Sequence, residues 1–322
     1  MNASISSHHI GLSRLKLYFA LSRTPHGVLD ISAPALGALL WLGSFPSLII
    51  VILGLFTAFA GYTAVYALND VVDYRIDKER VKSGELPASE TYLDDVLVRH
   101  PMAYGLLSFR DGLLWVLAWA FIALVGAYIL NPICALIFLV GCILETIYCF
   151  MLKVSPLRAF ISGVVKTSGG IAAVFAVDPH PSPLFLLLLF FMLFCWEVGG
   201  QNIPHDWEAI EEDRRLEAKT IPIQWGQEKA TNIIFVAIVV AVITTVILLL
   251  YYQARLNVLY ISVSLLVGCY LLIFPALKLN KTKERSAAMV LFNRASYYPV
   301  ALLVIVVIKI IIRYSGVNCE GV

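Results

Sequence analysis

Long apolar runs alternate with short polar segments along the whole chain. Nine runs have about the 20 residues that a helix needs to cross a hydrocarbon core; they cover residues 20–44, 47–68, 112–130, 132–151, 159–177, 183–201, 231–252, 257–278 and 288–312. Helices are expected because every backbone polar group must be satisfied inside lipid. The pattern predicts an all-α polytopic membrane protein of about nine transmembrane helices, in a single domain over residues 1–322 with a loose tail at 1–12.

Composition and charge support this class and predict an orientation. The chain is 60% hydrophobic and 14% charged, whereas soluble proteins carry about 25% charged residues. The chain has 24 Lys and Arg residues, and all except Arg255, Lys309 and Arg313 are predicted to lie on one side of the membrane. This count assigns Lys166 and Arg294 to the nearer membrane end. The positive-inside rule places that face and the N-terminus in the cytoplasm and the C-terminus outside. We expect the cell membrane of a bacterium or archaeon, no cleaved signal peptide, no nucleic-acid partner and no obligate protein partner.

Two long polar loops on the charged face are rich in carboxylates. The first begins with "YALNDVVDYRIDKER", residues 66–80, which contains Asn69, Asp70, Asp73 and Asp77. If the preceding helix continues, these four side chains share an arc of about 100°. Like charges so arranged repel, and a hard cation such as Mg²⁺ removes the repulsion. We therefore expect a metal site here.

The second loop, residues 199–226, reads "GGQNIPHDWEAIEEDRRLEAKTIPIQWG". Its Asp206 and Asp213 are seven positions apart and share a helix face. Basic residues accompany both clusters on the same side of the membrane: Arg80, Lys82, Lys153, Arg158 and Lys219. Carboxylates that hold a metal beside cations that hold oxyanions indicate a diphosphate site. The alternative is that the charges only enforce topology, but two clusters at one membrane boundary favour a site.

Three stretches carry a resemblance to a known family. "NDVVDYRID" matches the pattern NDxxDxxxD in full, "RVKSGELPAS" is similar to R-P-x-x-S-G-x-I-S with Val81 in place of proline, and "DRRLEAKTIPIQWG" is close to D-x-x-x-G-x-x-T-x-P-x-x-x-G. The chain resembles the UbiA superfamily of intramembrane prenyltransferases over nearly its whole length. It departs from the second family motif, DxxxD, because Ala209 stands where the first aspartate is usual. Asp206 or Glu208 is the candidate replacement.

The resemblance implies nine helices around a central cavity, with a cytoplasmic cap from the loops after helices 2 and 6. It implies that Mg²⁺ and a prenyl diphosphate are bound by Asn69, Asp70, Asp73, Asp77, Asp206 and Asp213, of which Asp70, Asp73, Asp77 and Asp213 are catalytic. It makes Arg80, Lys82, Lys153, Arg158 and Lys219 diphosphate contacts. Aromatic faces then stabilise an allylic cation; the candidates are Tyr62, Tyr66, Tyr148 and Trp196.

The activity implied is Mg²⁺-dependent transfer of a prenyl group to a lipophilic acceptor, with an aromatic acceptor of quinone or related lipid biosynthesis favoured. Two alternatives keep the fold: cyclisation of the prenyl cation, and phosphoribosyl transfer to a polyprenyl phosphate. A cation-coupled transporter is a third alternative. It is less favoured, because transporter carboxylates normally lie near the bilayer midplane and these cluster at the boundary. The acceptor, the prenyl chain length and the base that takes the acceptor's proton are not predicted.

Overall fold

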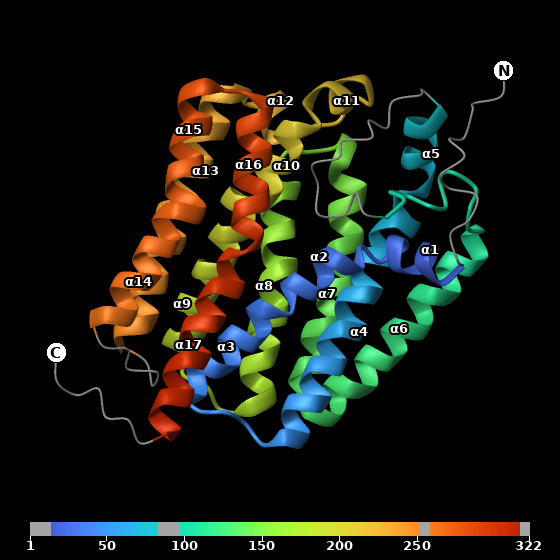
Figure 1. Ribbon diagram of the computed structural model, residues 1–322. Coiled ribbons are helices and arrows are strands. Elements are labelled where there is room, and N and C mark those ends of the chain that lie inside the picture. Colours follow the sequence, from blue (N-terminus) through green and yellow to red (C-terminus); the bar gives the residue numbers. More distant parts are fainter. Residues whose placement is uncertain (1–13, 83–96, 252–257, 316–322) are drawn as a thin grey trace.

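Eight helices in the described residues, 14–82, 97–251 and 258–315, are long and apolar enough to cross a membrane. In this computed structural model they span Leu48–Val72, Phe109–Leu130, Pro132–Lys153, Arg158–Val177, Pro183–Glu208, Gly226–Leu250, Val258–Thr282 and Arg285–Tyr314. They run side by side in one bundle (Figure 1). The all-α polytopic fold is therefore confirmed. The single-domain organisation stays a prediction, and the expected tail at 1–12 lies outside the described residues.

The expected first span, 20–44, is a series of shorter helices and not one long helix. They are α1 (Arg14–Leu21), α2 (Thr24–Asp30) and α3 (Ser32–Leu42). Arg23 has a left-handed backbone (φ 42°), which separates α1 from α2. Pro34 has no N–H to donate to the carbonyl of Asp30, and the helix is interrupted at Ile31. The count of nine long helices is thus not found among the described residues.

The remaining expected spans match the observed helices to within a few residues. In order, the elements are α4 (Leu48–Val72), α5 (Tyr74–Lys82), α6 (Phe109–Leu130), α7 (Pro132–Phe150), η3 (Met151–Lys153), α8 (Arg158–Val177), α9 (Pro183–Trp196), η4 (Glu197–Asn202), α10 (Ile203–Glu208), α11 (Ile210–Arg215), α12 (Ile221–Gln224), α13 (Gly226–Tyr251), α14 (Val258–Gly268), η5 (Cys269–Ile273), α15 (Phe274–Thr282), α16 (Arg285–Ser296) and α17 (Tyr298–Tyr314). Of these, η3 is a 3₁₀ turn, and η4 and η5 are π-helical.

Sequence signals explain several helix starts. The side chains of Ser108 and Asn131 accept hydrogen bonds from the backbone N–H of Asp111 (3.1 Å) and Ile133 (2.9 Å), which caps α6 and α7. Proline occupies the first turn of α7, α9, α10 and α17, where no N–H is needed. These signals fix where each span begins, and so which residues reach the polar end of the bundle.

Helices that carry the charged motifs gather at one end of the bundle. Figure 1 places α5, α10, α11 and α12 at the same end. Within the bundle, α3 packs against α8 and α17, and α9 packs against α13. The largest buried cluster unites α3, α9, α13, α16 and α17, while many large apolar side chains on the outer faces are exposed, as expected for contact with lipid.

Candidate active site

The first carboxylate cluster lies where α4 ends and α5 begins. Asp73, between the two helices, has a non-helical backbone (φ −83°, ψ 2°). Hydrogen bonds from Asp73 N to Asn69 O and from Asp77 N to Asp73 O, both 2.9 Å, continue the helical path through this break. Asp70 and Asp77 are both buried. Burial, reinforced by the neighbouring Asp77 carboxylate, raises the pKa of Asp73 to about 6.

His100 lies between Asp70 and Asp77, although the sequence does not predict it for the site. Its Nδ1 is 2.9 Å from Asp77 Oδ2 and 3.3 Å from Asp70 Oδ1, at angles unsuited to a regular hydrogen bond. Burial lowers the pKa of the imidazole, but the carboxylates of Asp77 and Asp70 outweigh burial and raise it to about 9. The ring is therefore positively charged at neutral pH and offsets part of the repulsion between the two aspartates.

Two strained residues converge on Asp70. Arg23 (φ 42°) and His100 (φ 53°) both have a left-handed backbone, which is uncommon for non-glycine residues. The Arg23 guanidinium lies 3.3 Å from Asp70 Oδ1 and 3.4 Å from Asn69 Oδ1. Such strain is typical of functional sites, where the surrounding structure imposes it. Arg23 and His100 are both far from Asp70 in the sequence and belong to no recognisable motif with it. The sequence alone therefore does not identify either residue as part of the site.

The second carboxylate cluster lies on α10 and α11, which meet at Ala209. Asp206 is buried, and its Oδ1 lies 3.5 Å from Arg158 Nη1. Arg158 also stacks over the Tyr148 ring, with its Cζ 4.1 Å from the ring centroid. Burial raises the pKa of Asp213 to about 7, and the Asp206 carboxylate adds to that effect.

Arg80 links the two clusters. Its guanidinium lies 3.3 Å from Asp77 Oδ1, 3.4 Å from Asp213 Oδ1 and 3.0 Å from Glu212 Oε1. The structure thus brings together the two motifs that the sequence separates by four spans. Carboxylates from α5 and α11 share one cation between them.

The donor set of these clusters fits a hard divalent cation. The carboxylates of Asp70 and Asp77 lie within 4.8 Å of one another beside the charged imidazole of His100, all three residues are buried, and the two carboxylates are the candidate oxygen ligands. Asp206 Oδ2 is also buried and has no hydrogen-bond partner among the described residues. Buried carboxylates without enough cations are costly, and Mg²⁺ binds through carboxylate oxygens.

The two candidates for the missing aspartate lie in different surroundings. Glu208 is directed toward α16, where Arg285 Nε donates a hydrogen bond of 2.9 Å to Glu208 Oε1. Asp206 faces Arg158 and lies within the electrostatic reach of Arg80, which also contacts Asp77 of the first cluster. The geometry therefore favours Asp206 over Glu208 as the replacement.

Two of the expected diphosphate contacts, Lys153 and Lys219, are not brought to the centre of the clusters. Lys153 is exposed, with its Nζ 3.9 Å from Glu79 Oε2, and Lys219 is also exposed. The side chain of Lys82 lies outside the described part of the structure. Their expected roles stay predictions.

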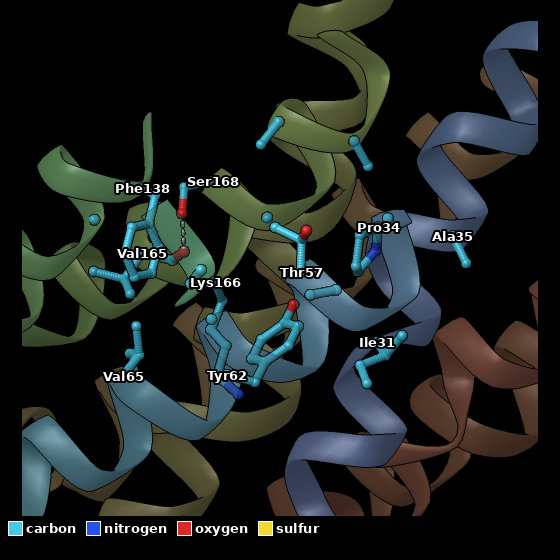
Figure 2. A pocket seen from close by; sticks show the side chains of 18 of the residues that line it. Ile31, Pro34, Ala35, Thr57, Tyr62, Val65, Phe138, Val165, Lys166 and Ser168 are labelled. Carbon is cyan, nitrogen blue, oxygen red and sulfur yellow. Dashed lines mark hydrogen bonds between the residues drawn. The ribbon is translucent and has the colours of Figure 1, made fainter. Parts of the chain in front are cut away.

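A cavity of about 530 Å³ lies inside the bundle, and Asn69 of the first cluster is part of its lining. Asn69, Tyr148, Asn202 and His205 line its polar end, and small or apolar residues such as Ile50 line it toward the other end of α4. Tyr62 and Tyr66 line it between these ends, and their expected role beside the allylic cation stays a prediction. Figure 2 shows Tyr62 and Lys166 among its apolar lining, close to Val65 and Phe138.

Trp196 does not line this cavity. Its indole is buried in the main apolar core, and its Nε1 donates a hydrogen bond of 2.8 Å to Ala295 O. The expectation that Trp196 faces the allylic cation is therefore wrong, because the side chain is directed from α9 toward α16.

Comparison of the sequence with known protein families shows which family it matches. Residues 31–297 match the sequence profile of the UbiA prenyltransferase family. The chain belongs to the UbiA prenyltransferase family. The match covers both carboxylate clusters and most of the cavity lining, and it identifies the protein as a prenyltransferase.

Similar proteins of this family come from archaea and bacteria. The chain is 28% identical to digeranylgeranylglyceryl phosphate synthase of Thermococcus sibiricus over 223 residues, which cover 68% of this chain and 72% of that protein. It is 26% identical to 4-hydroxybenzoate octaprenyltransferase of Shewanella woodyi over 219 residues, 66% of this chain and 70% of that one.

Solved structures of UbiA homologues share the fold. The apo structure of a homologue from Aeropyrum pernix K1 has a TM-score of 0.70 at 19% identity and covers 90% of this chain and 98% of its own. A homologue from Archaeoglobus fulgidus bound to GPP and Mg²⁺ has a TM-score of 0.65 at 17% identity, with 91% and 99% covered. At these identities the likeness establishes the fold alone.

This UbiA-family chain also buries ionisable residues inside the bundle. Lys166 on α8 contacts Asp30 and the hydroxyl of Tyr66, and Tyr66 also donates to Asp30. On α7, Glu145 Oε1 accepts a hydrogen bond of 2.8 Å from Asn69 Nδ2. Lys166 is thus part of the interior and not of the charged face to which its sequence position assigns it. The sequence does not predict Asp30, Glu145 or Lys166 for the site, since each is a single polar residue in an apolar run.

Proposed function

We propose that this prenyltransferase uses Mg²⁺ to transfer the prenyl group of a prenyl diphosphate to a lipophilic acceptor, with an aromatic acceptor of quinone or related lipid biosynthesis favoured. One observation carries the proposal: two buried carboxylate clusters, joined by Arg80, adjoin Asn69 and His205, which line a largely apolar cavity. A diphosphate fits the charged clusters, and a prenyl chain fits the apolar cavity. The Archaeoglobus homologue bound to GPP and Mg²⁺ supports this assignment.

We assign the residues to roles by position and chemistry. Asn69, Asp70, Asp73, Asp77, Asp206 and Asp213 would hold Mg²⁺, which when bound neutralises charge that develops on the leaving diphosphate. Arg80 and Arg158 lie among these carboxylates and would contact diphosphate oxygens. Lys82, Lys153 and Lys219 are weaker candidates. Tyr62, Tyr66 and Tyr148 line the cavity and would face the allylic cation.

The same proposal includes an orientation. The end of the bundle with α5, α10, α11 and α12 would form a cap that faces the cytoplasm of a bacterium or archaeon, with the C-terminus on the other side. The positive-inside distribution of Lys and Arg supports it. Reporter fusions at residues 83–96 and at the C-terminus test it, since the proposal requires opposite sides of the membrane.

The function is tested with purified protein, Mg²⁺ and prenyl diphosphates of several lengths. The acceptor panel includes 4-hydroxybenzoate and a glyceryl phosphate lipid, because relatives are named for such compounds. We expect a prenylated product with the wild type and none after chelation of Mg²⁺ or in Asp73→Asn. Cyclic hydrocarbon or phosphoribosylated lipid in place of this product would overturn the proposal in favour of the same-fold alternatives.

A further inference from the structure

The fifth of the eight long helices, Pro183–Glu208, contains the π-helical segment η4, which contributes residues to the cavity lining. Glu197 is its first residue and is buried, with 3% exposed. Two glycines in η4 allow close packing on both sides. A Cβ on Gly199 would lie 2.9 Å from Ile234 O of α13, and one on Gly200 would lie 2.9 Å from Ala295 Cβ of α16. The segment is therefore held tightly, as π-helical turns at functional sites often are.

The carboxyl group of Glu197 is only half satisfied. Ser162 Oγ on α8 donates a hydrogen bond of 2.8 Å to Glu197 Oε1. The second oxygen, Oε2, is buried and has no hydrogen-bond partner in the described part of the chain. Glu197 also lines the cavity. A buried carboxyl oxygen without a partner costs free energy, and a donor that approaches Glu197 would relieve that cost.

The nearby cation does not supply that donor. Lys166, one turn beyond Ser162 on α8, is paired with Asp30 and Tyr66. The positive charge of Lys166 is thus balanced by the carboxylate of Asp30 and not by that of Glu197. The two other buried carboxyl groups that lie inside the bundle near Lys166 differ, since Asp30 accepts from Lys166 and Tyr66, and Glu145 accepts from Asn69.

We infer that Glu197 is a catalytic residue that takes the proton of an acceptor hydroxyl, alcohol or phenol, during prenyl transfer. The inference rests on the proposed function and names its missing base. In the reaction a bond forms between the acceptor and C1 of the prenyl group, and the bond from C1 to the diphosphate oxygen breaks. The diphosphate leaves with the electron pair. The acceptor loses one proton, which passes to Glu197 Oε2 and then to water when the product departs. Ser162 is a positioning residue, because it holds Oε1 and leaves Oε2 without a hydrogen bond.

Glu197→Gln tests the assignment, since it keeps the side-chain size and removes the base. We expect kcat to fall about 100-fold or more, the range typical of general-base removal. The KM for prenyl diphosphate and its Mg²⁺-dependent binding, measured by calorimetry, should stay within about twofold of the wild type. Glu197→Asp should recover part of the lost kcat. Glu228→Gln, the same change on an exposed turn of α13, is the matched control and should leave kcat unchanged.

Ser162→Ala separates positioning from catalysis. We expect a smaller loss of kcat, about tenfold, and no further loss when it is added to Glu197→Gln, because both changes act on one group. The inference is overturned if Glu197→Gln keeps kcat within about threefold. It is also overturned if this variant loses prenyl diphosphate binding to the same degree, since the role is then structural. If the wild type itself binds no prenyl diphosphate, the proposed function fails, and the Glu197 assignment fails with it.

Discussion

Arg80 Nη2 and Asp213 Oδ1 lie 3.4 Å apart, although 133 residues separate them in the sequence. The same guanidinium is 3.3 Å from Asp77 on its own helix. One arginine therefore connects the two halves of the candidate site. A planar guanidinium can bind carboxylates and diphosphate oxygens with several hydrogen bonds at once, which a lysine ammonium cannot do in the same geometry.

Arg80→Ala is expected to raise the KM for prenyl diphosphate at least tenfold, which corresponds to about 1.4 kcal/mol. The physical reason is the loss of a charge-assisted contact to the diphosphate and of the link between α5 and α11. Arg80→Lys should recover little, because the fork geometry is lost. Steady-state kinetics with varied prenyl diphosphate measure both effects. Arg75→Ala, an exposed arginine on α5, is the control; an equal rise in KM in this variant would contradict a specific role for Arg80.

Most of the fold follows from the apolar pattern. Runs of the length of Leu48–Val72 or Phe109–Leu130 leave few alternatives to a spanning helix. The first span is the exception, because apolar length alone does not show the effect of Pro34 on the carbonyl of Asp30 or the left-handed turn at Arg23. The break of the first span into shorter helices therefore depends on local backbone geometry, which the hydrophobic pattern does not reveal.

The site was predictable only where spacing carries information. The repeated aspartates at 70, 73 and 77 share a helical path, so their convergence follows from helical geometry. His100 and Arg23 reach Asp70 through loop and turn geometry, and Glu197 reaches the cavity through a π-helical turn. A single His, Arg or Glu in the sequence carries no such period. Tertiary packing brings these residues to the site.

Asp206→Asn is expected to lower kcat strongly, while Glu208→Gln chiefly lowers stability. Asp206 faces Arg158 within the clusters, whereas Glu208 bonds to Arg285 and ties α10 to α16. Glu208 is buried but the Arg285 side chain is 49% exposed, so Glu208→Gln should lower Tm in detergent by less than the loss of a fully buried charged pair would. Paired measurements of activity and Tm distinguish the two. Wild-type activity in Asp206→Asn together with inactive, stable Glu208→Gln would show that Glu208 replaces the missing aspartate.

His100→Ala should destabilise the metal-free protein and increase its response to Mg²⁺. Without the imidazolium, Asp70 and Asp77 repel each other in a buried site, and the cost is about 3–5 kcal/mol before relaxation. We expect a lower Tm than the wild type in EDTA and a larger rise in Tm on addition of Mg²⁺. Thermal unfolding followed by tryptophan fluorescence measures both. His180→Ala, an exposed histidine after α8, is the control; equal Tm values for the wild type and His100→Ala in EDTA would contradict the prediction.

Gly54→Phe should shift the preference toward shorter prenyl diphosphates. Gly54 on α4 lines the cavity four turns before the Asp70 cluster, and a Cβ there meets no atom within 4 Å. The side chain therefore enters open space without displacing the backbone, and it occupies volume that a long prenyl chain needs. Forcing a chain past it would cost about 1–3 kcal/mol.

The measurement for Gly54→Phe is the ratio of kcat/KM for a short and a long prenyl diphosphate. We expect this ratio to rise at least tenfold over the wild type. The short substrate itself should be little affected, because its prenyl chain is too short to extend from the diphosphate site to Gly54. Ile52→Phe, on the same helix but exposed on the outer face, is the matched control and should leave the ratio unchanged. An equal loss of activity with both substrates would mean that the chain does not extend along this part of α4, and that the prenyl group occupies a different branch of the cavity.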